Sequence, residues 1–164
     1  MRLISFLIEG LFHLFRINRY RREEEIMIEN MHVEHMKSLS EKRTNKQKRL
    51  DWLKAVAVPE IVENVKELLD MHCFFDNHKD EIREDKEQVY LEIAIHLTEP
   101  EYTIETLMNT FDEALACTFG IALSRDELQK MSEYYYDNYY NAEMQLAYHS
   151  IANEKREQIE QNMR

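Results

Sequence analysis

Glycine and proline, the residues that most often make tight turns, are almost absent from this chain. Only two of each occur in 164 residues, whereas each normally makes up roughly 5–7% of a sequence. Hairpins and tight turns depend on these residues for their backbone angles. A chain of this length can bury a hydrophobic core without a metal or disulfide staple. We therefore predict an all-α fold, a bundle of about six or seven helices.

Apolar side chains recur at helical spacing through most of the chain. Ile61, Val65 and Leu68 share one face of a predicted helix. Ser124 and Glu127 have the spacing of a capping box, which predicts the start of a long helix continuing towards Ile159 without an interrupting glycine or proline. A similar box at residues 98–101, with a proline in its first turn, predicts another helix start.

Residues 88–97 are ambiguous between helix and strand. Apolar and polar side chains alternate there, as they do in a half-buried strand. The preceding residues are strong helix formers, and only residues 55–58 resemble a partner strand. Because two short strands make a marginal sheet, we favour a helix. An α+β fold with a short strand near residues 88–97 is the minor alternative.

The chain divides into two regions of different charge and pattern. Residues 40–49 contain no apolar side chain, and Thr44 and Gln47 have the spacing of another capping box, which predicts a break near residues 40–44. We therefore expect an amphipathic arm and basic junction over residues 1–44 and an acidic helical domain over residues 45–164. The net charge of −11 disfavours nucleic acid as a partner.

The first 17 residues are the most hydrophobic part of the chain. The polar residues Arg2, Ser5, Glu9, His13 and Arg16 form one narrow stripe of a helix and leave a wide apolar face. The face is too short to span a bilayer, which needs about 20 apolar residues. It favours packing on the chain's own core, and the alternatives are a partner's groove, a second copy of the chain, or a membrane surface anchored by residues 2–17. The docking residues are Leu3, Phe6, Leu7, Leu11, Phe12 and Phe15.

Two cysteines do not make a disulfide framework. Cys73 and Cys117 lack the spacing of a redox or zinc motif. We interpret them as reduced, mostly buried thiols of a cytoplasmic protein, which could also lie at the membrane periphery.

Motifs for catalysis are missing. The sequence contains no nucleophile elbow, zinc-protease motif or phosphate-binding glycine loop. Glu29 and His32 have the Glu-x-x-His spacing of di-iron bundles, but such a site requires a second copy of the motif, and the chain has none. We therefore expect no enzyme activity and no cofactor. A metal-binding bundle enzyme using Glu29 and His32 is an alternative.

Two candidate surfaces point to protein binding. Exposed tyrosines are enriched at interfaces, and five tyrosines lie within residues 134–140. Acidic residues are dense over residues 76–87, where we expect a negative helix surface that would attract a basic partner. We predict a non-enzymatic regulator or adaptor that binds a protein with a basic surface, or a further copy of itself. The predicted binding residues are Tyr134, Tyr136, Tyr139, Tyr140, Asp80, Glu84 and Glu87.

Overall fold

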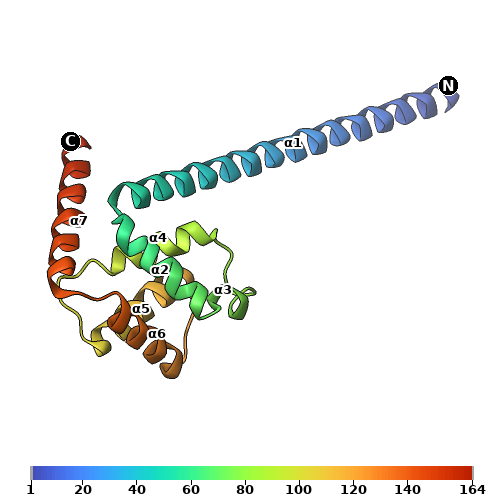
Figure 1. Ribbon diagram of the computed structural model, residues 1–164. Coiled ribbons are helices and arrows are strands. Elements are labelled where there is room, and N and C mark those ends of the chain that lie inside the picture. Colours follow the sequence, from blue (N-terminus) through green and yellow to red (C-terminus); the bar gives the residue numbers. More distant parts are fainter. Residues whose placement is uncertain (1, 164) are drawn as a thin grey trace. The chain divides into compact units, whose positions relative to one another are not determined.

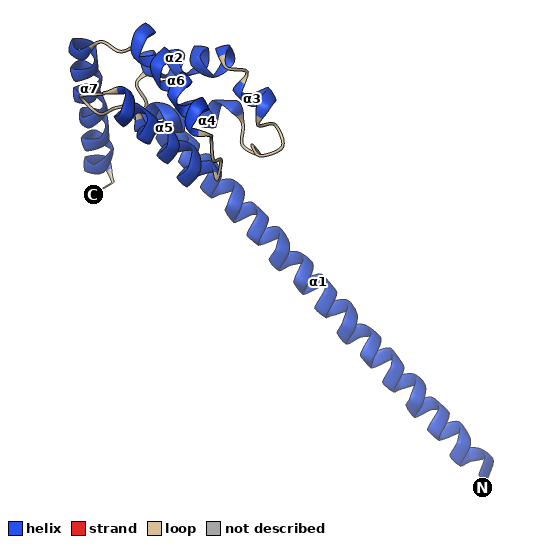
Figure 2. Cartoon of the chain, turned by 90° about the horizontal axis from the view of Figure 1, so that it is seen from below, coloured by secondary structure: helices blue, strands red, loops and turns tan. Residues whose placement is uncertain are grey.

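The computed structural model describes the backbone of residues 2–163 and the side chains of residues 22–163. The described chain has seven helices and no strand (Figures 1 and 2), which confirms the predicted all-α bundle. The helices are α1 (Arg2–Val56), α2 (Pro59–Met71), α3 (Phe74–Asn77), α4 (Lys86–His96), α5 (Ile104–Phe119), α6 (Arg125–Asn138) and α7 (Ala142–Asn162).

The chain forms two units, residues 1–48 and residues 49–164. Helix α1 continues without interruption through residues 40–44, so the predicted break there is wrong. Thr44 does not cap a new helix; its hydroxyl donates to the Ser40 carbonyl oxygen one turn earlier, at 2.9 Å. The polar stretch contains neither glycine nor proline, and it marks an exposed length of helix.

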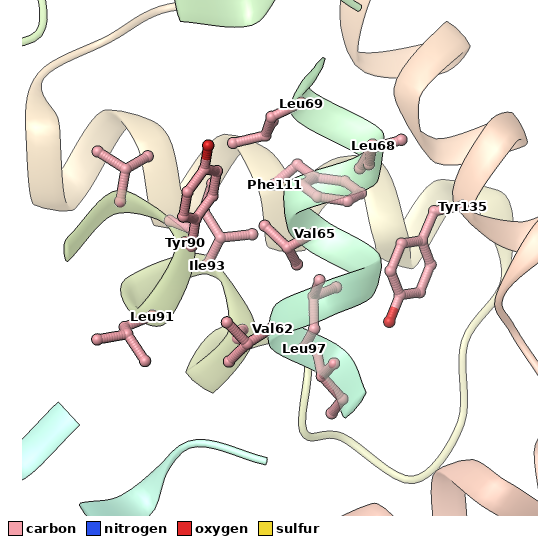
Figure 3. Close-up of a cluster of buried hydrophobic side chains, with 14 of the residues drawn as sticks. Val62, Val65, Leu68, Leu69, Tyr90, Leu91, Ile93, Leu97, Phe111 and Tyr135 are labelled. Carbon is pink, nitrogen blue, oxygen red and sulfur yellow. The ribbon is translucent and has the colours of Figure 1, made fainter. Parts of the chain in front are cut away.

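The core of the second unit is built around one side of α2. Ile61, Val65 and Leu68 are completely buried, as their spacing predicted. Figure 3 shows side chains of α2 among those of α4, Phe111 of α5 and Tyr135 of α6. Pro59 occupies the first turn of α2, where a missing backbone N–H costs nothing.

Residues 88–97 are helical, so the minor α+β alternative is wrong. Six consecutive side chains of α4, Val89 to Ala94, are buried. A helix covered on every side carries no simple amphipathic stripe. This explains why the apolar pattern of the segment resembled a strand.

An ion pair between the buried Glu92 and Arg49, whose side chain is 46% exposed, holds the end of α1 to α4 within the second unit. Glu92 of α4 is only 2% exposed, and Arg49 donates to both of its carboxylate oxygens, with Nε to Oε1 at 2.9 Å and Nη2 to Oε2 at 2.7 Å. The Arg49 guanidinium also lies 4.7 Å from the centre of the Trp52 ring. This fork geometry is the strong form of the carboxylate–guanidinium pair.

Two of the predicted helix boundaries are wrong, and one is confirmed. The capping box of Ser124 and Glu127 starts α6 as predicted. Helix α5 is instead capped by Thr103 with Thr106, while the buried Thr98 hydroxyl donates to the Ile95 carbonyl. The long helix predicted to run from residue 124 towards residue 159 ends at Asn138. A separate helix, α7, follows, and Asn141 is its N-cap, with a side chain that accepts hydrogen bonds from two backbone N–H groups.

Helix α7 adds Tyr148 and Ala152 to the core and also makes polar contacts with loops. The buried Gln145 side chain donates to the carbonyl oxygens of Leu97 and Glu99, both at 2.8 Å. His149 Nδ1 lies 2.8 Å from the Thr98 carbonyl oxygen, and Lys155 Nζ donates to the Ala57 carbonyl oxygen at 2.8 Å. Backbone carbonyls of two loops therefore fix the position of the last helix.

The two cysteines are free and exposed, so their predicted burial is wrong. Cys73 has a left-handed backbone angle, φ 49°, where the chain turns from α2 into α3. Its side chain therefore lies in a turn and outside the core.

The ion pair between Arg49 and the buried Glu92 gives a first prediction. Replacing Arg49 with Met leaves the Glu92 carboxylate buried without a counter-charge, so the free energy of unfolding should fall by about 2–3 kcal/mol. Arg49→Met combined with Glu92→Met should regain most of that loss, because no charge then stays buried. Urea unfolding measures both. The exposed pair Lys54–Glu87, at 3.3 Å, provides the control, since Lys54→Met should cost less than about 1 kcal/mol. Equal losses at the two pairs would contradict this account.

The buried tyrosines give a second prediction. Burial raises the pKa of Tyr102 and of Tyr135 well above the ordinary value, so the folded protein holds these phenol protons more tightly than the unfolded chain. Their stabilisation is complete below about pH 10 and is lost as the pH rises towards the folded-state pKa. The free energy of unfolding should therefore fall steeply above about pH 10. The rise in tyrosinate absorbance and the loss of helical circular dichroism should occur over the same pH range. Tyr135→Phe should make the fall shallower, and an unchanged slope would refute the assignment.

Candidate protein-binding surface

The outward side of α2 carries a row of carboxylates. Apart from Lys66, the charged residues of this helix are acidic, and they recur at intervals of three or four residues opposite the buried stripe. Lys66 is engaged by Glu63, with Nζ to Oε1 at 2.7 Å, and this hydrogen bond raises the Lys66 pKa. We call this surface the α2 acidic face; it comprises Glu60, Glu63, Glu67, Asp70 and the exposed Met71.

The acidic face contains a shallow, open depression of about 580 Å³. Carboxylates line it together with the paired lysine, one amide and the 59% exposed Met71; the lining residues are Glu63, Asn64, Lys66, Glu67, Asp70 and Met71. A hollow with carboxylate sides and a flexible thioether can accept a cation together with its aliphatic stem.

Two of the predicted tyrosines adjoin this face. Tyr134 makes an edge contact with the ring of His72 at the end of α2, with ring centres 5.6 Å apart, and contacts Tyr139 at 5.9 Å. Burial, with the nearby Glu67 carboxylate, raises the pKa of Tyr139. The Tyr139 hydroxyl nevertheless lacks a hydrogen bond of good geometry among the described residues. We call Tyr134 and Tyr139, both half-buried, the tyrosine pair.

The other two predicted tyrosines lie together in a different place. Tyr136 and Tyr140 stack at 4.9 Å, and Tyr140 contacts Tyr102 at 6.1 Å. The Tyr140 hydroxyl accepts a long hydrogen bond from the Tyr102 N–H, at 3.4 Å. These contacts place the stacked rings beside the loop that precedes α5, where Tyr140 has a structural role.

The predicted acidic helix over residues 76–87 does not form. Helix α3 ends at Asn77, and the chain then runs through turns and loop to α4, so Asp80 and Glu84 lie in the connection. Asp80 is exposed, the Glu84 carboxylate accepts from the Arg83 N–H, and Glu87 pairs with Lys54. These carboxylates therefore share no helix face.

The acidic connection between α3 and α4, residues 78–85, contacts the start of α6, whereas the predicted tyrosines lie at its end. His78, which begins the connection, lies 3.8 Å from the carboxylate of Glu127 near the start of α6. Tyr136 lies near the end of the same helix, about 14 Å further along at 1.5 Å per residue. The two predicted surfaces are therefore separate.

A smaller cavity of about 180 Å³ lies between α3 and α6. Its polar side chains already have partners: His78 contacts Glu81 and Glu127, His72 Nδ1 contacts the Leu68 carbonyl, and Lys130 pairs with Asp126. The α2 acidic face is the better candidate because the exposed carboxylates of Glu67 and Asp70 line a larger and more open hollow.

The remaining predicted residues lie in α1. Glu29 and His32 are exposed, and no group of three metal-ligating side chains occurs among the described residues. No described helix has an apolar stretch long enough to cross a membrane. The predicted docking residues of the arm lie outside the residues whose side chains are described; they are Leu3, Phe6, Leu7, Leu11, Phe12 and Phe15.

Sequence reasoning missed the α2 acidic face, although the signal was present. Glu60, Glu63, Glu67 and Asp70 follow the same spacing as the apolar stripe of the helix, half a turn away. The denser charge run over residues 76–87 had predicted a different acidic surface. What the sequence could not show is that the tyrosine pair lies at the end of α2.

Comparison with known proteins provides no relative: no protein-family model, curated protein or solved structure is significantly similar to this chain.

Proposed function

We propose that this chain is a non-enzymatic adaptor or regulator that binds a basic segment of another protein on the α2 acidic face and the tyrosine pair. The observation that supports this most strongly is the edge contact between Tyr134 and His72, with ring centres 5.6 Å apart, which places the tyrosine pair beside the end of α2. Charge and aromatic surface are thus available to one ligand.

The chemistry of the surface defines the partner. Four carboxylates and one paired lysine give α2 a net charge of −3. Lysine or arginine side chains of a partner would meet these carboxylates and pack their aliphatic stems on Met71. Arginine could also stack on Tyr134, since guanidinium groups favour aromatic faces. Opposite charges across such an interface speed association and exclude acidic competitors.

A site-specific photo-crosslinker tests this surface. The full chain carrying p-benzoylphenylalanine in place of Met71 should capture one protein from native lysate, and capture should weaken as salt is raised because exposed charges are screened. The matched control places the same photo-crosslinker at Glu113, an exposed residue of α5, where no specific product is expected.

Charge reversal identifies which acidic surface is used. Glu67→Lys with Asp70→Lys should reduce the crosslinked product about tenfold or more, since two attractive contacts become repulsive. Asp80→Lys with Glu84→Lys changes the net charge equally at the other acidic segment and should have little effect. If the second pair abolished capture and the first did not, the proposed surface would be wrong.

A further inference from the structure

Residues 22–48 of α1 form a helix that is exposed along its whole described length. Within it, seven large apolar side chains are each at least 38% exposed: Ile26, Met27, Ile28, Met31, Val33, Met36 and Leu39. An isolated helix in water gains little stability from its own hydrogen bonds, and most helices depend on packing of an apolar face. A second helix packed along this segment would shield part of this apolar surface, including Ile28 and Leu39, from water.

One seam on this helix follows the spacing of a two-stranded coiled coil. Six residues recur at alternating intervals of three and four; they are Glu25, Ile28, His32, His35, Leu39 and Lys42. Positions at equal distances from the centre of this seam carry side chains that can pair with one another. The two ends have opposite charges, the next two positions inward are aliphatic, and the two central positions are histidines.

This symmetry distinguishes the two possible directions of a second copy. A parallel pair would place Glu25 against Glu25 and Lys42 against Lys42 of the second copy, and like charges in facing positions repel. An antiparallel pair places Glu25 against Lys42, Ile28 against Leu39 and His32 against His35. Glu25 and Lys42 are both exposed, so both charges are accessible to a second chain.

We propose that the chain self-associates through antiparallel pairing of α1 residues 25–42 with the same segment of a second copy. The two-fold axis passes between Val33 and Glu34, and each Glu25 meets Lys42 of the second copy. This interface shares no residue with the α2 acidic face, so the proposal does not depend on the proposed binding function.

Disulfide trapping tests both direction and register. The two natural cysteines, which are exposed, are first replaced with Cys73→Ser and Cys117→Ser. In this background, Ile28→Cys and Leu39→Cys proteins should each fail to crosslink to themselves. In the antiparallel pair, residue 28 of one copy lies eleven positions away from residue 28 of the other copy, about 16 Å along the helix. This is beyond the Cα separation of roughly 7 Å that a disulfide can bridge. An equimolar mixture with oxidised glutathione should give the mixed dimer.

Charge variants provide an independent measurement. Lys42→Glu should weaken the dimer about tenfold or more in sedimentation equilibrium with chelator present, and adding Glu25→Lys should restore it by exchanging the charges. Lys37→Glu makes the same change on the opposite side of the helix and is the matched control. The proposal is overturned by a monomer at all concentrations, by efficient self-crosslinking of each single-cysteine protein, or by equal effects of Lys42→Glu and Lys37→Glu.

Discussion

Burial of one side of α2 is the packing interaction on which the rest of the second unit depends. Ile61, Val65 and Leu68 are withdrawn completely from water, and α3, α4 and α6 all pack against this helix. Three completely buried side chains of this size contribute roughly 5–9 kcal/mol of transfer free energy before entropy is counted. The orientation that buries this stripe also turns the carboxylates of α2 outward. The same helix therefore organises the core and presents the proposed binding surface.

Polar contacts then determine which helices join the core and where. A core of aliphatic residues tolerates many arrangements, whereas a buried polar group must find its partner. Glu92 can be buried on α4 only if Arg49 reaches it, which fixes the end of α1. Gln145 is buried only because two loop carbonyls accept its protons, which fixes α7. Each of these contacts contributes little net free energy when it forms. Breaking either one leaves an unpaired buried group, which is costly, so these groups specify the arrangement of the helices.

The sequence predicted the fold class because local signals agreed with the final packing. The capping box at Ser124, the stripe on α2 and the shortage of glycine and proline all act within one or two turns of helix. Errors arose where distant contacts decided the result. Thr98 has the right spacing for a cap, yet its hydroxyl bonds backwards to Ile95 and accepts from Arg156 of α7. Tyr139 ends α6, Tyr140 packs against the distant Tyr102, and Asn141 then starts a new helix.

The candidate surface shows the same division. The spacing of the α2 carboxylates is visible in the sequence, but the placement of Tyr134 and Tyr139 beside them depends on how α6 packs. The most direct test of the central claim is to map amide chemical shifts of the isotope-labelled chain during titration with a short lysine-rich helical peptide. The account predicts the largest changes at Glu63, Glu67, Asp70 and the tyrosine pair, with an acidic peptide of equal length causing none. Changes concentrated at residues 80–87, or equal changes with both peptides, would contradict it.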